Sequence, residues 1–282
     1  MKIAVLGSKG LLGAELVSLI AQTSNTFAAF HRGNFDIKST TSELTQSLGA
    51  FDIVINAIAY TNVDLAEEQQ SEALFTNGTF PGELAKALEG TNSHLIHLST
   101  DYVFDGFATE PYLVSSQPNP QTSYGRSKFF GEQKVLATTS DATIVRTAWL
   151  YGARGECFPK TIANKLLRDG YVRVVDDQIG QPTWAKDVAR EILKIAETRP
   201  SNNIIHAVSS GQATWADFAA EISLSLGFDP TKSVTRVQSS EFVTKAARPH
   251  WSVLDNSFNG HPLLADWKSR WREASPEIFK SL

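Results

Sequence analysis

The chain has 282 residues, of which 42% are hydrophobic and 20% are charged, and its formal net charge is -4 at pH 7. This composition is ordinary for a globular protein, and the length predicts one large domain or two unequal ones. The absence of a basic block argues against nucleic acid as a partner. No apolar run is long enough to span a membrane, and glycines interrupt the short apolar N-terminus too early for a signal peptide, so we expect a cytoplasmic protein.

Cysteine and histidine indicate little chemistry in this sequence. Cys157 is the only cysteine, which excludes an intrachain disulfide, and we interpret it as a small packed side chain or an idle thiol. The six histidines have no spacing typical of metal ligands. We therefore predict no metal site.

Strands and helices alternate over the first 152 residues. Apolar runs predict strands at residues 2–7, 26–30, 51–60, 94–100 and 143–152. Helical spacing of apolar residues predicts helices at 10–22, 43–48, 71–90 and 127–137, with Pro81 disturbing the third. This alternation is typical of an α/β fold, a Rossmann-type doubly wound parallel sheet with right-handed crossovers.

The alternation loosens after residue 152. There we expect helices at 160–170, 184–197 and 214–227, and strands at 171–177 and 203–208. We predict a dinucleotide-binding domain over residues 1–152, to which 183–210 returns, and a smaller, helix-rich substrate lobe over 153–282. The lobe is expected to close over the carboxyl ends of the strands, where open α/β sheets bind ligands.

A glycine-rich turn, GSKGLLG at residues 7–13, joins the first strand to the first helix. Gly7 and Gly10 permit a tight turn and let the backbone approach a pyrophosphate, whose charge then faces the helix N-terminus. The spacing differs from the G-x-G-x-x-G of dehydrogenase domains in general, and a turn without a ligand is the alternative. The strand before the turn and the helix after it favour a cofactor site.

The end of the second strand indicates which dinucleotide is used. An acid there binds the ribose of NAD, whereas an arginine accommodates the additional phosphate of NADP. The sequence FHRGNFDI places His31 and Arg32 there, with no acid before Asp36, so we predict NADPH, with NADH possible. Asp36 and Ile37 are expected to meet the adenine. A solvated surface role is the alternative for Arg32.

Three polar residues predict a proton-transfer site. Thr100 ends a predicted strand, and Tyr124 and Lys128 follow four residues apart, which places them on one face of a helix. We expect the Lys128 ammonium and an oxidised nicotinamide to lower the pKa of the Tyr124 phenol from about 10 toward the working pH. Thr100 would polarise and place a substrate carbonyl. An exposed helical pair without chemistry is the alternative.

Several segments together resemble a known family. The glycine loop and Tyr-x-x-x-Lys are typical of the extended short-chain dehydrogenase/reductases, and STDYVFDG, DQIGQPT and ARPHWSVLD are similar to the dTDP-4-dehydrorhamnose reductase family within them. Further matching segments are GSKGLLGAEL, NAIAYTNVDLAEE, PQTSYGRSKFFGE and RTAWLYG. The resemblance implies an NAD(P)H-dependent oxidoreductase that reduces the C4 keto group of dTDP-4-dehydro-L-rhamnose to dTDP-L-rhamnose, a polysaccharide precursor.

The resemblance also implies roles for individual residues. Thr100, Tyr124 and Lys128 correspond to the catalytic triad, with threonine where many relatives have serine. The residues implied in cofactor binding are Gly10, Leu11 and Leu12 on the loop and Ile58, Ala59 and Tyr60 on the nicotinamide side.

Four further positions are implied in binding the nucleotide-sugar, in addition to Thr100. They are Val63, Asp101, Trp149 and Arg248. The alternatives are plain packing for Val63, a turn cap for Asp101 and a core position for Trp149. The guanidinium fork of Arg248 matches the oxygens of a diphosphate, and a structural ion pair is its alternative.

The sequence departs from the family pattern in two places. FHRGNFDIKST lacks the acidic pattern often found there, which leaves the cofactor preference open. In some relatives glutamates link a dimer through a metal. Glu15 matches one such position, but Lys186 lies where another carboxylate would be needed, so a homodimer is possible and no metal is predicted.

Two other functions are weighed against this one. The first is a 4-keto reductase that acts on another nucleotide-deoxysugar. The second is a non-catalytic regulatory subunit that binds NADP and a partner enzyme. The complete set of Thr100, Tyr124 and Lys128 argues against the second, because a binding module needs no such set.

Overall fold

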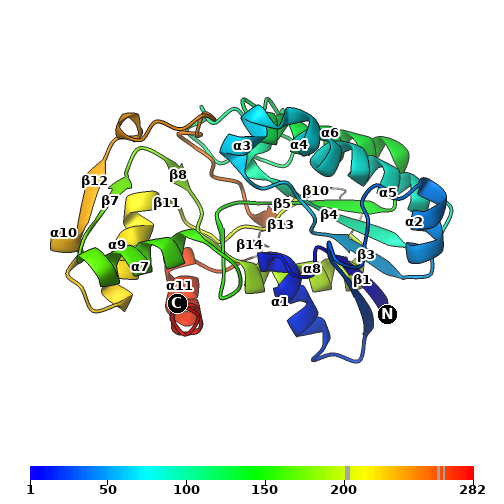
Figure 1. Cartoon of the computed structure of the whole chain (residues 1–282), viewed down its shortest axis with the longest axis horizontal. Coiled ribbons are helices and arrows are strands. Elements are labelled where there is room, and N and C mark those ends of the chain that lie inside the picture. Colours follow the sequence, from blue (N-terminus) through cyan, green and yellow to red (C-terminus); the bar gives the residue numbers. More distant parts are fainter. Residues whose placement is uncertain (201–203, 259–260, 263) are drawn as a thin grey trace.

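The computed structural model describes residues 1–200, 204–258, 261–262 and 264–282. Figure 1 shows two parts side by side, a parallel sheet covered by helices and a smaller part that contains the C-terminal helix. The N-terminus lies in the first part and the C-terminus in the second (Figure 1). Of the strand predicted at 203–208, residue 203 lies outside the described residues.

The main sheet has six strands in the order β10-β5-β4-β3-β1-β2, and all neighbours are parallel. The strands are β1 (Lys2–Leu6), β2 (Thr26–Phe30), β3 (Ile53–Asn56), β4 (His94–Thr100), β5 (Ala142–Thr147) and β10 (Ile204–His206). The predicted doubly wound sheet is confirmed. The strand predicted at 51–60 ends early because the Asn56 side chain accepts the Ile58 N–H at 3.1 Å and turns the chain. The strand predicted at 143–152 breaks where Trp149 takes a φ of 44°.

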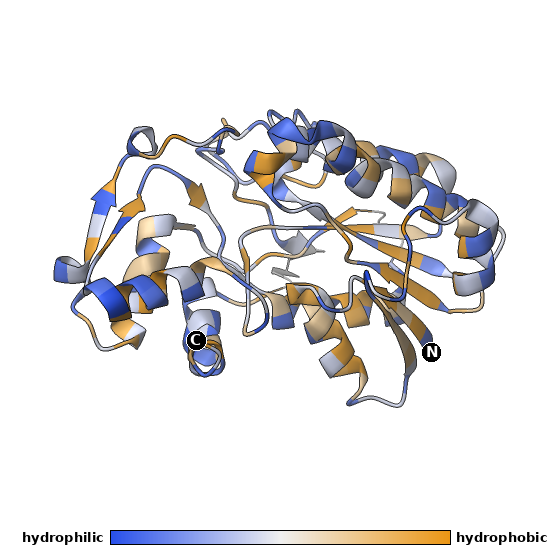
Figure 2. Cartoon of the chain, in the orientation of Figure 1, coloured by the Kyte–Doolittle hydropathy of each residue, from blue (hydrophilic) through white to orange (hydrophobic). Residues whose placement is uncertain are grey.

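Helices bury both faces of this sheet. One face is covered by α1 (Leu11–Ile20) and α8 (Ala185–Thr198), and the other by α2 (Thr41–Leu48), α5 (Phe80–Leu88) and α6 (Ser123–Thr138). Because successive strand residues point to opposite faces, β1 sends Ile3 and Val5 to the first layer and Ala4 and Leu6 to the second. Figure 2 shows the resulting hydrophobic strands between the two helical layers.

The helix predicted at 71–90 is divided into three pieces. They are α4 (Gln70–Leu74), a π-helical turn (Phe75–Thr79) and α5. Pro81 lies in the first turn of α5, where its missing N–H is tolerated. The short helix α3 (Val63–Glu68) was not predicted, because Ala66 is its only buried residue and gives no apolar periodicity.

Helix α6 begins four residues before its predicted start at 127. The Thr122 side chain caps it by accepting the Gly125 N–H at 3.0 Å. A capped start of this kind satisfies a backbone donor that otherwise has no partner. As a result, Tyr124 lies in the first turn of the helix and Lys128 in the second.

The smaller part surrounds an aromatic core that includes Tyr151, Phe218 and Trp271. Its helices are α7 (Phe158–Asp169) and α9 (Trp215–Ser225), which were predicted, and α11 (Trp267–Phe279), which was not. The remaining strands and helices after β5 are β6 (Leu150–Tyr151), β7 (Val172–Val175), β8 (Ile179–Gly180), β9 (Thr183–Trp184), β11 (Ala213–Thr214), α10 (Pro230–Ser233), β12 (Val234–Val237), β13 (Ser257–Phe258) and β14 (His261–Pro262). Across the described ranges, no helix is long and apolar enough to cross a membrane.

Candidate functional site

The glycine turn after β1 packs so closely on neighbouring backbone that side chains at Gly7 and Gly13 would clash. Gly7 has a φ of 82°, and a Cβ on it would lie 2.8 Å from the Ala57 carbonyl oxygen. A Cβ on Gly13 would lie 2.1 Å from the Gly7 carbonyl oxygen. The backbone N–H groups of Gly7 and Ser8 both donate to Phe30 at the end of β2, at 3.0 and 2.9 Å. The turn is therefore fixed by backbone contacts alone.

The N-terminus of α1 opens directly onto this turn. Gly10 is its N-cap and offers no side-chain hydrogen bond, and the first turn, which starts at Leu11 and Leu12, contains no acidic residue. Helix N–H groups without a cap form a ready anion site, and a carboxylate there would compete for it. The glycine turn and the open helix end fit the pyrophosphate of a dinucleotide.

The polar residues that follow β2 have different partners. The His31 ring accepts the Gly33 N–H at 3.0 Å, and the His31 N–H donates to the Asn34 side chain at 2.7 Å, so this histidine shapes the turn. Asp36 accepts the Lys38 N–H at 2.8 Å, and Ile37 packs on the hydrophobic core. Arg32 is exposed. A cation in this position fits an extra phosphate on the adenosine ribose.

Asn77 joins the segment Ile58–Tyr60 to helix α6. Its side chain accepts the Tyr60 N–H at 2.8 Å and donates to the Tyr60 carbonyl at 3.1 Å and to the Ser127 hydroxyl at 3.0 Å. Ser127 in turn donates to the Tyr124 carbonyl at 2.7 Å. The expected cofactor-lining residues Ile58, Ala59 and Tyr60 are therefore held in register with Tyr124. The sequence analysis missed Asn77, which lies in the π-helical turn and is fully buried.

Thr100 and Tyr124 come together at the carboxyl end of β4. Thr100 is the last residue of the strand, and its hydroxyl lies close enough to the Tyr124 phenol to affect the pKa of that group. Burial raises the pKa of Tyr124 to about 12, and the Thr100 hydroxyl only partly opposes the rise. Without the cofactor the phenol pKa is thus raised, and the lowering expected beside an oxidised nicotinamide stays a prediction. Lys128 is not among the groups that shift it.

Lys128 is buried one helical turn after Tyr124. Its ammonium donates to the Leu98 carbonyl at 2.6 Å. Burial lowers the pKa of Lys128 to about 8, and Glu132 opposes the change. Glu132 is itself paired with Arg146 by two hydrogen bonds of 2.9 and 2.7 Å, and both side chains are 1% exposed. The lysine is thus fixed by the backbone of β4 beside a buried carboxylate.

Asp101 follows Thr100 and is 4% exposed. Its carboxylate accepts the Thr100 hydroxyl at 2.8 Å. Burial raises the pKa of Asp101 to about 6, and the Thr100 and Ser252 hydroxyls oppose the rise. A carboxyl group of this kind is poised to change charge just below neutral pH.

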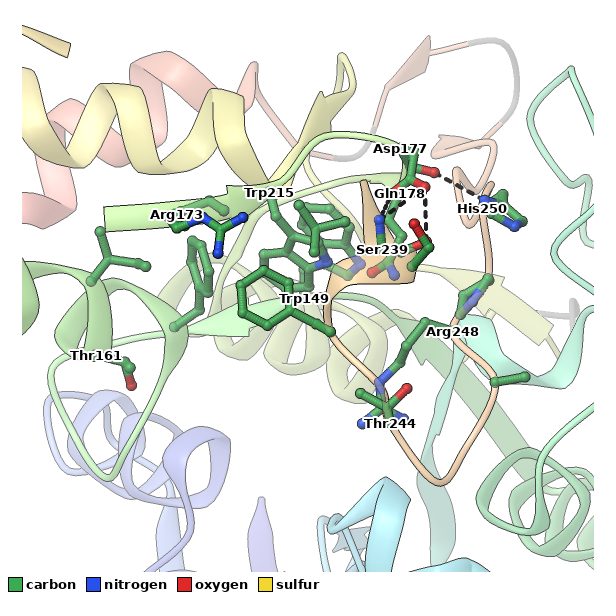
Figure 3. A pocket seen from close by; sticks show the side chains of 18 of the residues that line it. Trp149, Thr161, Arg173, Asp177, Gln178, Trp215, Ser239, Thr244, Arg248 and His250 are labelled. Atoms are coloured by element: carbon green, nitrogen blue, oxygen red, sulfur yellow. Dashed lines mark hydrogen bonds between the residues drawn. The ribbon is translucent and has the colours of Figure 1, made fainter. Parts of the chain in front are cut away.

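A cavity of about 810 Å³ adjoins these residues. Tyr102, Trp149, Arg173, Trp215 and Arg248 are among the residues that line it, and Thr100, Tyr124 and Lys128 are not. The connection runs through Tyr102, whose ring centroid lies 5.5 Å from that of Tyr124. Figure 3 shows the two indoles between Arg173 on one side and Arg248 on the other. The cavity therefore lies next to Tyr124, with aromatic and cationic residues in its walls.

Of the residues expected to bind the sugar, some line the cavity and others do not. Trp149 stacks on Trp215 with ring centroids 3.4 Å apart, and both line the cavity. Arg248 also lines it and pairs with Asp64 at 2.5 Å. Val63 is half-buried at the start of α3 and is not among the lining residues. Tyr102, Arg173, Trp215 and Asp64 were not predicted, because no local motif marks them.

The residues near Glu15 form an ion-pair cluster. The Glu15 side chain is 5% exposed, and burial and Glu277 raise its pKa, whereas Lys186 opposes the rise. Lys186 donates to Glu277 at 3.1 Å. In the part of the chain that the structure describes, no three His, Cys, Asp or Glu side chains gather in a way that could hold a metal ion.

Comparisons with known proteins agree with this geometry. The chain matches the RmlD substrate binding domain family over residues 1–282. It is 39% identical to a probable dTDP-4,6-dihydroxy-2-methyloxan-3-one 4-ketoreductase of Streptomyces antibioticus, over 99% of this chain and 96% of the relative. It is 37% identical to the dTDP-4-dehydrorhamnose reductase of Streptomyces griseus, over 99% of this chain and 93% of the relative. A crystal structure of dTDP-4-dehydrorhamnose reductase from Bacillus anthracis in complex with NADP superposes on this chain with a TM-score of 0.92 and 31% identity. The match covers 98% of this chain and 99% of that structure.

Proposed function

The chain belongs to the dTDP-4-dehydrorhamnose reductase family, and we propose that it reduces the C4 keto group of dTDP-4-dehydro-L-rhamnose to dTDP-L-rhamnose with NADPH. It is an oxidoreductase of the extended short-chain dehydrogenase/reductase type. The observation that carries the proposal is the placement of the Tyr124 phenol beside Thr100 at the end of β4, next to the segment that Asn77 holds. The product is a precursor for polysaccharide biosynthesis.

Tyr124 is the proton donor in this proposal. Its raised pKa keeps the phenol protonated at neutral pH, as a donor to the new alkoxide must be. The Thr100 hydroxyl orients the C4 carbonyl against Tyr124. When bound, the reduced nicotinamide supplies the hydride. In the protein alone, the Lys128 ammonium donates to the Leu98 carbonyl and is not among the groups that shift the Tyr124 pKa. In this proposal it stabilises the phenolate once the cofactor and substrate are bound.

The adjoining cavity would take the nucleotide-sugar. Arg248 and Arg173 provide guanidinium groups suited to a diphosphate, and the stacked Trp149 and Trp215 provide a flat aromatic wall. Asp101 follows Thr100 and accepts its hydroxyl. It is proposed to contact the sugar, as is Trp149.

The cofactor half of the proposal rests on backbone geometry. Gly7, Gly10 and the start of α1 would hold the pyrophosphate, and Arg32 the 2′-phosphate of NADPH. We also propose that residues 1–152 with 183–210 form the cofactor domain and 153–282 mainly the substrate lobe. The enzyme would act in the cytoplasm, where reduced dinucleotides are available.

A direct assay tests this function. Purified protein is mixed with dTDP-4-dehydro-L-rhamnose and either NADPH or NADH, and loss of the reduced cofactor is followed by absorbance. We expect oxidation that depends on the sugar and is faster with NADPH. No oxidation with either cofactor would contradict the proposal and would favour the regulatory subunit.

A second candidate is a 4-keto reductase for a different dTDP-deoxysugar. It is favoured by the similarity to the Streptomyces antibioticus 4-ketoreductase, which is 39% identical. A panel of dTDP-4-keto-sugars that differ at C2, C3 and C5 separates the two candidates. The sugar with the highest kcat/KM identifies the substrate.

A further inference from the structure

Trp149 has an unusual backbone for a large side chain. Its φ of 44° lies in the left-handed region, which non-glycine residues rarely adopt. The residue bridges the end of β5 and the start of β6, and its carbonyl accepts the Thr183 N–H at 3.2 Å. Such a conformation persists only where surrounding contacts enforce it, and it is frequent at functional sites.

The indole of Trp215 supplies one of these contacts. The two rings are nearly parallel, with 4° between their planes and 3.4 Å between centroids. Trp215 is itself firmly placed, because it is the first residue of α9 and follows the Thr214 N-cap, which forms a capping box with Asp217. The Phe158 ring supports Trp215 at a centroid distance of 4.5 Å.

A glycine leaves room for the Trp149 ring. A Cβ on Gly180 would lie 2.4 Å from the indole of Trp149, which is closer than side chains can pack. The ring of Trp149 is therefore confined between the β8 backbone and Trp215. Figure 3 shows the stacked pair inside the cavity that adjoins the catalytic residues.

We propose that Trp215 is a positioning residue, which holds Trp149 as the wall against which the keto-sugar is placed beside Tyr124. The inference rests on the proposed function, since it requires a sugar that contacts Trp149. It assigns a role to the smaller part of the chain in orienting the reacting group, because Trp215 belongs to α9 and Trp149 follows a strand of the main sheet.

The test substitutes Trp215 in two ways. Trp215→Leu keeps an apolar side chain but removes the aromatic face, and Trp215→Phe retains a smaller one. We expect kcat/KM for the keto-sugar to fall about tenfold in the leucine variant, with a raised sugar KM and an unchanged NADPH KM. The phenylalanine variant should recover most of the loss. Simple loss of folded protein would not change one KM and spare the other.

Circular dichroism detects the stacking of Trp149 on Trp215 directly. Two parallel indoles in contact give an exciton couplet, which should vanish in Trp215→Leu. Gly180→Ala provides a second route that leaves Trp215 unchanged, since the added methyl must displace the Trp149 ring. It should weaken both the couplet and the activity. Trp251 is one of the six tryptophans of the chain and does not line the cavity, so Trp251→Phe should preserve both.

Three outcomes separate the possibilities. Loss of the couplet together with the selective rise in sugar KM supports the positioning role. Loss of the couplet with wild-type kcat and KM in both Trp215→Leu and Gly180→Ala overturns it and leaves the proposed function intact. A wild-type protein that does not oxidise NADPH with any keto-sugar overturns the proposed function, and the positioning role with it.

Discussion

The two halves of the site are built from different parts of the polypeptide. The cofactor half is formed by backbone, with Gly7 and Gly13 packed against carbonyl groups and the start of α1 free of a capping side chain. The substrate half is formed by side chains from distant segments. The ion pair between Arg248 and Asp64, for example, joins residues that are 184 positions apart.

This difference has a physical consequence for variation. A tight backbone turn permits few solutions, because a Cβ at Gly7 or Gly13 would clash with neighbouring backbone, and so glycines are needed at fixed spacing. A pocket of side chains can be rebuilt by substitution without moving the backbone. We therefore expect changes in the first half to disturb every reaction of the enzyme, and changes in the second half to alter which sugar is used.

The largest effect is expected from Tyr124→Phe, at the junction of the two halves. The variant keeps the ring but lacks the proton donor, so kcat should fall by about a hundred- to ten-thousand-fold. Binding of NADPH, measured by fluorescence titration, should remain close to that of the wild type. Retained turnover would show that another group supplies the proton.

The pH dependence of stability should reveal Asp101. Its pKa is about 6 in the folded protein against 3.8 ordinarily, so the folded state holds a proton between these values that the unfolded chain has lost. The contribution of this group to the free energy of unfolding is thus fully present below about pH 4. It falls by about 3 kcal/mol as the pH rises through 6. Asp101→Asn should remove this slope in urea unfolding measured from pH 4 to 7. Equal slopes in both proteins would contradict the assignment.

Gly13→Ala tests the backbone half. The new methyl group would lie 2.1 Å from the Gly7 carbonyl oxygen, so α1 must move away from the turn. We expect a loss of about 1–3 kcal/mol in stability and weaker NADPH binding. Gly152→Ala is the matched control, since its Cβ would meet Leu11 at an ordinary 3.6 Å. Similar losses in both variants would mean that the region is generally intolerant.

The smallest of these effects is expected from Arg248→Lys in the side-chain half. Lysine keeps the charge but loses the fork that suits a diphosphate, so the sugar KM should rise about tenfold with little change in kcat. Asp64→Asn breaks the ion pair and keeps the arginine, and it should change KM less. If both variants change KM equally, the pair has a structural role only.

The contrast between a cofactor half built from local backbone and a substrate half built from distant side chains explains which features were predictable from sequence. The glycine turn, the strand ends at Phe30 and Thr100 and the Tyr124–Lys128 pair are local, and each depends on neighbouring residues in the chain. Tyr102 and Trp215 act through contacts that only the folded chain creates. The effect of burial on the phenol pKa could not be predicted from sequence either, because it depends on how the folded chain encloses Tyr124 and turns Lys128 to the Leu98 carbonyl.

Asn77 remained hidden for a related reason, since an ordinary helix was expected across 71–90. The π-helical turn at Phe75–Thr79 holds one residue more than regular winding would allow. Deleting a single residue there would restore the regular helix and rotate Asn77 by about 100° relative to α5. Its bonds to Tyr60 and Ser127 would then be lost together. The number of residues in this helical segment is therefore critical, because it aligns the Ile58–Tyr60 segment with helix α6.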